Sequence, residues 1–99
     1  MWYVIVGQDN PGSLEQRKAN RPAHLQRLEV LRDLGRLQVA GTFPEIDDED
    51  QGPAGFTGSL IIADFTDLES AKAWAGEDPY LLAGVYATVD VRPFRKVLP

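Results

Sequence analysis

Apolar and polar positions alternate along parts of the chain and follow a helical spacing in others, which divides it into short strands and helices. Runs rich in β-branched and aromatic residues predict strands at 2–8, 37–42, 56–65 and 85–94. Helical spacing predicts helices at 14–20, 22–34 and 66–75, and Asp78-Pro79 opens a single helical turn that Gly84 stops. The third strand should place Ser59, Ile61 and Ala63 on one face and Leu60 and Ile62 on the other.

Turn and capping residues place the ends of these elements. Ser13 and Thr66 each precede a Gln or Glu by three residues, which is the spacing of a capping box. Pro22 is expected to interrupt the first helical region, so that a second helix starts there. Gly35 supplies the left-handed conformation that ends this second helix. The segment 44–55 is predicted to be an acidic, glycine-containing loop or hairpin arm.

The elements follow the order strand, helix, strand, strand, helix, strand across residues 1–99, and no linker is long enough to separate two domains. This order is typical of a ferredoxin-like βαββαβ sandwich, an α+β fold with an antiparallel four-stranded sheet. Helices cover one face of such a sheet. We therefore predict a single domain of this architecture.

The first and third predicted strands carry apolar residues on both of their faces. In the first strand, for example, Val4 and Val6 alternate with Tyr3 and Ile5. Both faces of the sheet then need an apolar cover, and no part of the chain is left over to supply the second one. We expect a second copy packed sheet to sheet, which is a homodimeric α/β barrel. The alternative is a second face that stays partly exposed, since scattered apolar surface residues are normal.

The composition excludes several classes of site. The chain is 43% hydrophobic and 25% charged, with no Cys and one His. The lack of Cys excludes disulfides, thiol nucleophiles and thiolate metal sites, and a lone His excludes any site that needs two imidazoles. We therefore expect no metal and no cofactor. The sequence has neither an apolar run of about 20 residues nor an export signal, which predicts a cytoplasmic protein without a membrane partner.

Charge is unevenly distributed. Ten Lys and Arg residues against fifteen Asp and Glu residues give a net charge of −5. Five of the acids fall within residues 45–50, so the rest of the chain is balanced. Nucleic acid is not an expected partner, because phosphate binding needs a clustered basic face. The acidic run lacks the spacing of a calcium loop, so we interpret it as a solvated loop.

His24 is the first candidate for a catalytic role. At 3.6 residues per turn it shares one line of the predicted helix with Leu28 and Leu31. The ordinary interpretation of such a residue is a core imidazole with one or two hydrogen bonds. The predicted position in the first turn after Pro22 favours a general base instead. The positive end of a helix disfavours the imidazolium and leaves a neutral ring near pH 7.

Asp78 is the best candidate for orienting His24. An Asp that precedes Pro at a helix start is also the ordinary N-cap arrangement, which explains the residue without any function. The two roles are compatible, because a capping carboxylate is held rigidly, stays ionised and is able to fix a histidine tautomer. The spacing alone does not place the two side chains in contact.

Three further residues are candidates for substrate binding. Arg21 and Tyr80 adjoin the two catalytic candidates in sequence and suit a small anionic or hydroxylated organic ligand, although each is more often a surface or packing residue. Ser59 falls between Gly58 and Leu60 in the third predicted strand, where a hydroxyl can face a pocket, but no nucleophile elbow surrounds it. Three glycines recur every third residue without a phosphate-binding fingerprint and are expected in turns and close backbone approaches: Gly52, Gly55 and Gly58.

Several short motifs together resemble the YciI-like (YCII-related) family. They are the opening Tyr-Val-Ile strand, Arg21-Pro22-Ala23-His24-Leu25, Gly55-Phe56-Thr57-Gly58-Ser59, Asp78-Pro79-Tyr80, Ala83-Gly84-Val85-Tyr86 and Val91-Arg92-Pro93-Phe94. Each is weak alone, but their order runs from end to end of the chain. The resemblance implies a bacterial, cytoplasmic, dimeric α/β barrel whose site is built around a His and an Asp, here His24 and Asp78. Some relatives resemble lyases or isomerases of chlorinated or hydroxylated ring-derived compounds.

These observations leave three functional hypotheses. The first is a cofactor-independent enzyme of the lyase or isomerase type, in which His24 moves a proton and Asp78 orients it. The alternative is a non-catalytic metabolite-binding or accessory protein that uses the same pocket. The third, a haem protein or an oxygen-dependent enzyme, is disfavoured because a lone His offers only one axial ligand.

Overall fold

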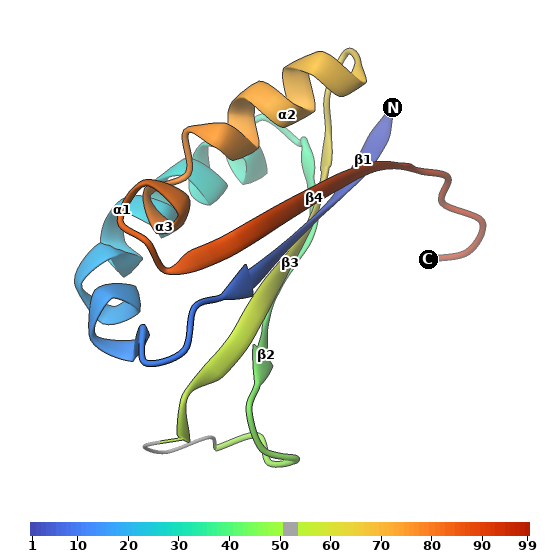
Figure 1. Cartoon of the computed structure of the whole chain (residues 1–99). Helices are drawn as coiled ribbons and strands as arrows, with labels where there is room; N and C mark the ends of the chain where they lie inside the picture. The colour runs from blue at the N-terminus through green and yellow to red at the C-terminus, as the bar shows by residue number, and fades with distance from the viewer. Residues whose placement is uncertain (51–53) are drawn as a thin grey trace.

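The computed structural model describes residues 1–50 and 54–99 and contains one antiparallel sheet with three helices in these ranges (Figure 1). The strands are β1 (Trp2–Asp9), β2 (Leu37–Pro44), β3 (Phe56–Asp64) and β4 (Tyr86–Phe94), and the helices are α1 (Leu14–Asp33), α2 (Leu68–Gly76) and α3 (Pro79–Leu82). The strand order is β2-β3-β1-β4, and each neighbouring pair is antiparallel. The ferredoxin-like α+β fold predicted from the order of elements is confirmed.

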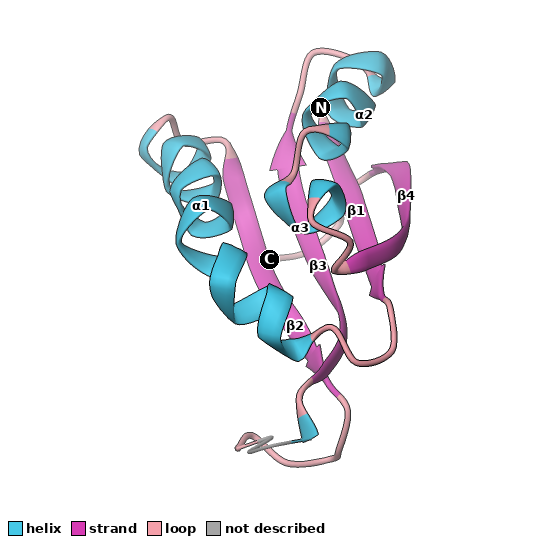
Figure 2. Cartoon of the chain, turned by 60° about the vertical axis from the view of Figure 1, so that its left-hand side comes forward, coloured by secondary structure: helices cyan, strands magenta, loops and turns pink. Residues whose placement is uncertain are grey.

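All three helices lie on the same side of the sheet (Figures 1 and 2). The core forms between them and the inward-facing residues of the two central strands, of which Ile5, Ile61 and Ala63 are at most 3% exposed. Leu28 and Leu31 of α1 close the core from above. This alternation confirms the predicted division of β3 into two faces. Among the described residues, no helix is long and apolar enough to cross a membrane.

The opposite side of the sheet carries none of the described helices, yet it is apolar at its centre. Val4 lies beside Ile62 and Val6 beside Leu60 in the pairing of β1 with β3, and all four side chains are half-buried. Val39 of β2 extends this surface and is 48% exposed. We call these five residues the open-face patch. The sequence predicted this apolar surface, because the first and third strands carry apolar residues on both of their faces.

The first helical region is one helix and not two. The sequence predicted separate helices at 14–20 and 22–34, but α1 runs without a break from Leu14 to Asp33 with Pro22 inside it. A proline in a helix interior costs about 3 kcal/mol, because it removes one hydrogen bond and crowds the preceding turn. Buried side chains on both sides of the proline offset this cost, since Arg17 and His24 both face the sheet.

The helix starts also differ from the predicted capping boxes. Ser13 occupies the N-cap position of α1, but its side chain makes no capping hydrogen bond. The N-cap of α2 is Asp67 and not Thr66, because the Asp67 carboxylate accepts a hydrogen bond from the Ser70 backbone N–H at 2.8 Å. A carboxylate next to a threonine is the stronger acceptor, so the helix begins one residue later than the pattern predicted.

Two of the three regularly spaced glycines have the predicted backbone roles. Gly55 adopts a left-handed φ of +83° just before β3. Gly58 faces β1 so closely that a Cβ atom there would collide with the carbonyl oxygen of Gly7. Gly52 lies outside the described residues. The close approach draws together the ends of β1 and β3 from which Asp9 and Ser59 reach the functional site.

Candidate functional site

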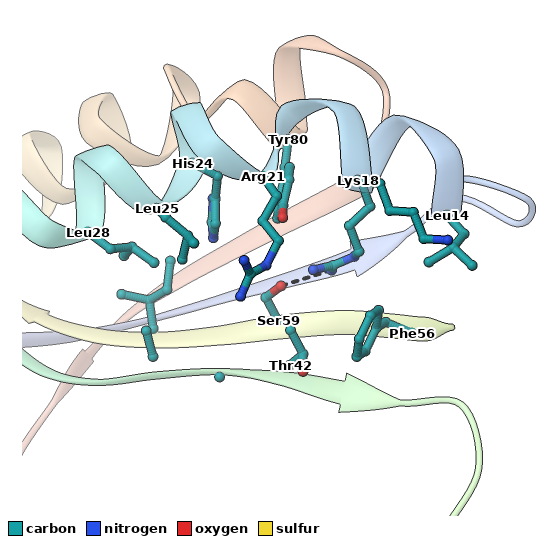
Figure 3. A pocket seen from close by; sticks show the side chains of 14 residues that line it. Leu14, Lys18, Arg21, His24, Leu25, Leu28, Thr42, Phe56, Ser59 and Tyr80 are labelled. Carbon is teal, nitrogen blue, oxygen red and sulfur yellow. Dashed lines mark hydrogen bonds between the residues drawn. The ribbon is translucent and has the colours of Figure 1, made fainter. Parts of the chain in front are cut away.

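A cavity of about 480 Å³ lies between α1 and the sheet. Its lining comes from α1, β2, β3 and α3, and Figure 3 shows the side chains of His24, Arg21 and Ser59 converging on it. Every residue that the sequence suggested for the site lines this cavity except Asp78, which lies behind His24. A volume of this size suits a small organic molecule.

The structure brings His24 and Asp78 together. The imidazole Nδ1 lies 2.9 Å from Asp78 Oδ1 and 3.1 Å from Oδ2, and both side chains are buried. Asp78 is also the N-cap of α3, since its Oδ1 accepts the backbone N–H of Tyr80 at 2.9 Å. Because a carboxylate only accepts hydrogen bonds, Nδ1 is the protonated nitrogen of the neutral ring, and Nε2 is left as an acceptor.

His24 does not lie in the first turn of its helix, contrary to the prediction from the sequence. The sequence placed His24 in the first turn of a helix, where the helix dipole would act on it, whereas α1 begins ten residues earlier at Leu14. The dipole acts only within the first and last turns of a helix. The helix end therefore does not favour a general base at this position, and the features that orient His24 are Asp78 and the aromatic ring beside it.

Tyr80 is the aromatic ring that packs on His24. The two ring centroids lie 3.9 Å apart with an interplanar angle of 12°, which is a stacked arrangement. Tyr80 is 2% exposed, and burial raises the pKa of its hydroxyl, although the positive charges of Arg17 and Arg21 act against this. The stack restricts rotation of the imidazole about χ2 and so keeps Nδ1 directed at Asp78.

Arg17 is a site residue that the sequence reasoning missed. Its Nε donates to Asp9 Oδ2 and its Nη2 to Asp9 Oδ1, each at 2.9 Å, and both side chains are only 4% exposed. Nη2 also donates to Ser59 Oγ at 2.9 Å, the bond marked by the dashed line at Ser59 in Figure 3. Burial alone would lower the pKa of Arg17, but the hydrogen bonds and charge of Asp9 outweigh it and raise the pKa.

Arg21 has a different character from Arg17. It is exposed, yet its side chain extends from α1 towards Ser59 at the cavity (Figure 3). It forms no ion pair or hydrogen bond with any residue that the structure describes. Lys18 lines the same side of the cavity and is paired only loosely, at 3.9 Å, with Glu15. The cavity thus has positive charge at its mouth without a matching carboxylate, which favours anionic ligands.

Tyr86 lies beneath the site at the start of β4. Its ring meets Tyr80 edge-on with centroids 5.6 Å apart. It occupies the space that Gly7 leaves open, because a Cβ at residue 7 would come within 2.6 Å of the Tyr86 ring. The hydroxyl is fully buried and makes no close hydrogen bond with any described residue, although Ser59 lies near enough to act on it as a hydrogen-bond partner. Burial raises the pKa of this hydroxyl well above its ordinary value.

No group of three or more His, Cys, Asp or Glu side chains within residues 1–50 and 54–99 is arranged to hold a metal ion. Two hydrogen-bonded pairs build the site instead: His24 with Asp78, and the ion pair of Arg17 with Asp9. Both pairs are buried and both adjoin Tyr80, since its ring stacks on His24 and lies 4.7 Å from the Arg17 guanidinium carbon. The site can therefore hold a proton at His24 and negative charge near Arg17.

Solved structures share this fold. The 5-chloro-2-hydroxyhydroquinone dehydrochlorinase (TftG) from Burkholderia phenoliruptrix AC1100, in complex with 2,5-dihydroxybenzoquinone, is 29% identical, with a TM-score of 0.84 over 96% of this chain and 94% of the other. Protein Atu4242 from Agrobacterium tumefaciens is 16% identical, with a TM-score of 0.54 over 98% of this chain and 94% of the other. The second similarity supports the fold alone.

Curated sequences are closer still. Protein YciI from Escherichia coli O6:H1 (strain CFT073) is 58% identical over 97 residues, which cover 98% of this chain and 99% of the relative. An uncharacterized protein from Haemophilus influenzae (strain Rd) is 56% identical over the same shares. The family model of the YCII-related domain matches residues 1–95. Matches of this extent, over a chain that folds as described, show that the protein belongs to the YCII-related family.

Proposed function

We propose that the protein is a lyase or isomerase that acts on a small organic molecule without a cofactor. The observation that carries this proposal is the buried hydrogen bond between His24 and Asp78 beside the cavity. A base whose tautomer is fixed by a carboxylate, with its free nitrogen directed away from that carboxylate, is the arrangement that general-base catalysis needs.

In the proposed reaction, His24 Nε2 removes a proton from a carbon atom of the substrate. Asp78 holds the ring by its Nδ1–H and stabilises the positive charge that the ring then carries. The same ring later returns the proton, to a different carbon in an isomerisation or to the departing group in an elimination. Neither outcome changes the oxidation level of the protein, so His24 and Asp78 suffice for the proton transfer.

The proposed substrate is a small anionic or hydroxylated ring compound. The cavity volume of about 480 Å³ supports a ligand of this size, and the charge of Arg21, which pairs with no carboxylate in the described part of the chain, supports an anion. Support also comes from the structural similarity to the dehydrochlorinase, which is named for a chlorinated hydroxyhydroquinone and was solved with a dihydroxybenzoquinone. Ser59 and Tyr80 complete the binding residues that we propose.

The test is to incubate the protein with 5-chloro-2-hydroxyhydroquinone and related halogenated or lactone substrates and to measure chloride release or isomerisation. We expect His24→Ala to lower kcat by about 10²–10⁴-fold, the usual contribution of a general base. Arg32→Gln is the control, since Arg32 is an exposed residue in the last turn of the same helix, away from the cavity. Full activity in His24→Ala would refute the role. Binding of 2,5-dihydroxybenzoquinone without any turnover would favour the non-catalytic alternative.

We also propose that two copies pack through the open-face patch to form a dimeric α/β barrel. The support is the contiguous apolar surface on the sheet face that carries none of the described helices. Apolar surface of this kind is buried in a stable protein by another layer. A second copy presents the same patch, so a twofold axis through it buries both at once.

A further inference from the structure

Asp9 fixes the guanidinium of Arg17 in one orientation. The carboxylate binds the side of the guanidinium formed by Nε and Nη2, through two hydrogen bonds of 2.9 Å. Two aromatic rings also contact the guanidinium, since its carbon lies 5.1 Å from the centroid of Phe56 and 4.7 Å from that of Tyr80. A guanidinium held in this way needs no rearrangement to donate to a ligand.

Part of the hydrogen-bonding capacity of Arg17 is left over. Of its five N–H groups, the one on Nε and two on Nη2 serve Asp9 and Ser59. Nη1 makes no close hydrogen bond with any residue that the structure describes and is not one of the buried polar atoms that lack a partner, so it keeps access to the cavity. The Tyr80 hydroxyl, for which Arg17 is a side-chain hydrogen-bond donor, competes with a ligand for this guanidinium. Because the guanidinium is planar, one Nη1–H points parallel to the Nη2–H that reaches Ser59.

Ser59 adds a second donor at the same place. Its Oγ accepts the hydrogen bond from Arg17, so its own O–H donates elsewhere, either to the buried Tyr86 hydroxyl beside it or to an oxygen atom in the cavity. Ser59, Arg17 and His24 all line the cavity. An oxygen atom of a bound molecule that sits next to Ser59 Oγ would receive two hydrogen bonds, one from Arg17 Nη1 and one from Ser59.

The geometry points to an oxyanion site formed by Arg17 and Ser59, which makes the substrate class an enolisable carbonyl compound or its phenol equivalent. This inference rests on the proposed function, because it supplies the group that stabilises the charge created when His24 removes a proton. Arg17 then acts on the reacting atoms directly, whereas the exposed Arg21 serves recognition at the cavity mouth.

The chemical step balances without any further reactant. The C–H bond next to the carbonyl breaks, its proton goes to His24 Nε2, and its electron pair forms a C=C bond. The π pair of the carbonyl moves to the oxygen, which becomes an enolate held by Arg17 and Ser59. When the carbonyl re-forms, the electrons either take up the proton at another carbon or expel a leaving group from the β carbon with its electron pair.

The buried charges of Asp78 and Arg17 explain why this charge separation is favourable. The imidazolium forms against Asp78 and the enolate forms against Arg17, so each new charge meets a fixed charge of opposite sign. Asp9 balances Arg17 in the resting site, which allows a guanidinium to be buried there at all. The raised pKa of Arg17 keeps this donor charged throughout the reaction.

The test uses 4-nitrophenol as a probe, because its absorbance reports the phenolate directly and no turnover is needed. We expect the native protein to bind the phenolate in preference to the phenol, which lowers the apparent pKa of the bound probe. Ser59→Ala, and Arg17→Met combined with Asp9→Asn, should weaken phenolate binding tenfold or more. Replacing the ion pair as a unit avoids a buried unpaired carboxylate. Should the double variant unfold in circular dichroism, Arg17→Lys with Ser59→Ala carries the test.

His24→Ala separates this inference from the proposed function. We expect it to keep the phenolate preference, since the oxyanion donors remain, while abolishing any turnover. Equal binding of phenol and phenolate by the native protein, or no binding, would overturn the oxyanion site. So would loss of the preference in His24→Ala alone. A retained preference together with undiminished turnover in His24→Ala would support the oxyanion site and refute the general base.

Discussion

At the scale of single residues, two buried tyrosines should lower the free energy of unfolding at alkaline pH. Burial raises the pKa of both Tyr80 and Tyr86 above the value of about 10 that a tyrosine has in the unfolded chain. The folded state therefore holds the phenolic proton more tightly. This contribution to stability is complete below pH ~10 and is lost as the pH rises above it.

We expect the free energy of unfolding, measured with urea at stepped pH, to fall above pH ~10 together with a delayed rise in tyrosinate absorbance. Tyr86→Phe keeps the ring against Gly7 and removes the ionisable group, so it should flatten this fall. Tyrosines that all titrate as in the unfolded chain would contradict the expectation.

Sequence patterns predicted only some of the residues of the candidate site. Helical spacing from Leu28 and Leu31 identified His24 as buried, and the N-cap pattern identified Asp78 as a rigid carboxylate. The spacing of seven residues between Arg17 and His24 would have placed Arg17 on the same face, but the predicted break at Pro22 hid it. The ion pair with Asp9 joins a strand to a helix, so no local pattern signals it.

At the scale of elements, the sequence predicted the strands and their faces more accurately than the ends of the helices. The period of two residues in β1 and β3 reports directly which side chains face the core, because each strand is covered on one face by helices. Helix ends depend on single side chains that compete for the same N–H groups. Ser13 and Thr66 satisfy the capping pattern, yet neither is the capping acceptor.

The energetic cost of Pro22 inside α1 can be tested with single substitutions. It interrupts the hydrogen bonding of α1 at an exposed position, so Pro22→Ala should restore one hydrogen bond and raise the free energy of unfolding by about 1–3 kcal/mol. Ala19→Pro, at another exposed position of the same helix, should lower it by about 3 kcal/mol or more. Urea denaturation measures both. A destabilised Pro22→Ala would show that the proline sets a local geometry that the rest of α1 requires.

At the scale of the whole molecule, the open-face patch decides the assembly. We expect sedimentation equilibrium at micromolar concentration to give twice the chain mass of 11.0 kDa. Ile62→Glu places a charge at the centre of the patch and should shift the protein to monomers, because an unpaired carboxylate in an apolar interface costs several kcal/mol. Val30→Glu is the control, since Val30 is 54% exposed on α1, on the other side of the sheet. A native protein that sediments as a monomer would leave the patch in water and contradict the barrel. The oxyanion site would be unaffected in that case, because all of its residues lie on the helical face of one chain.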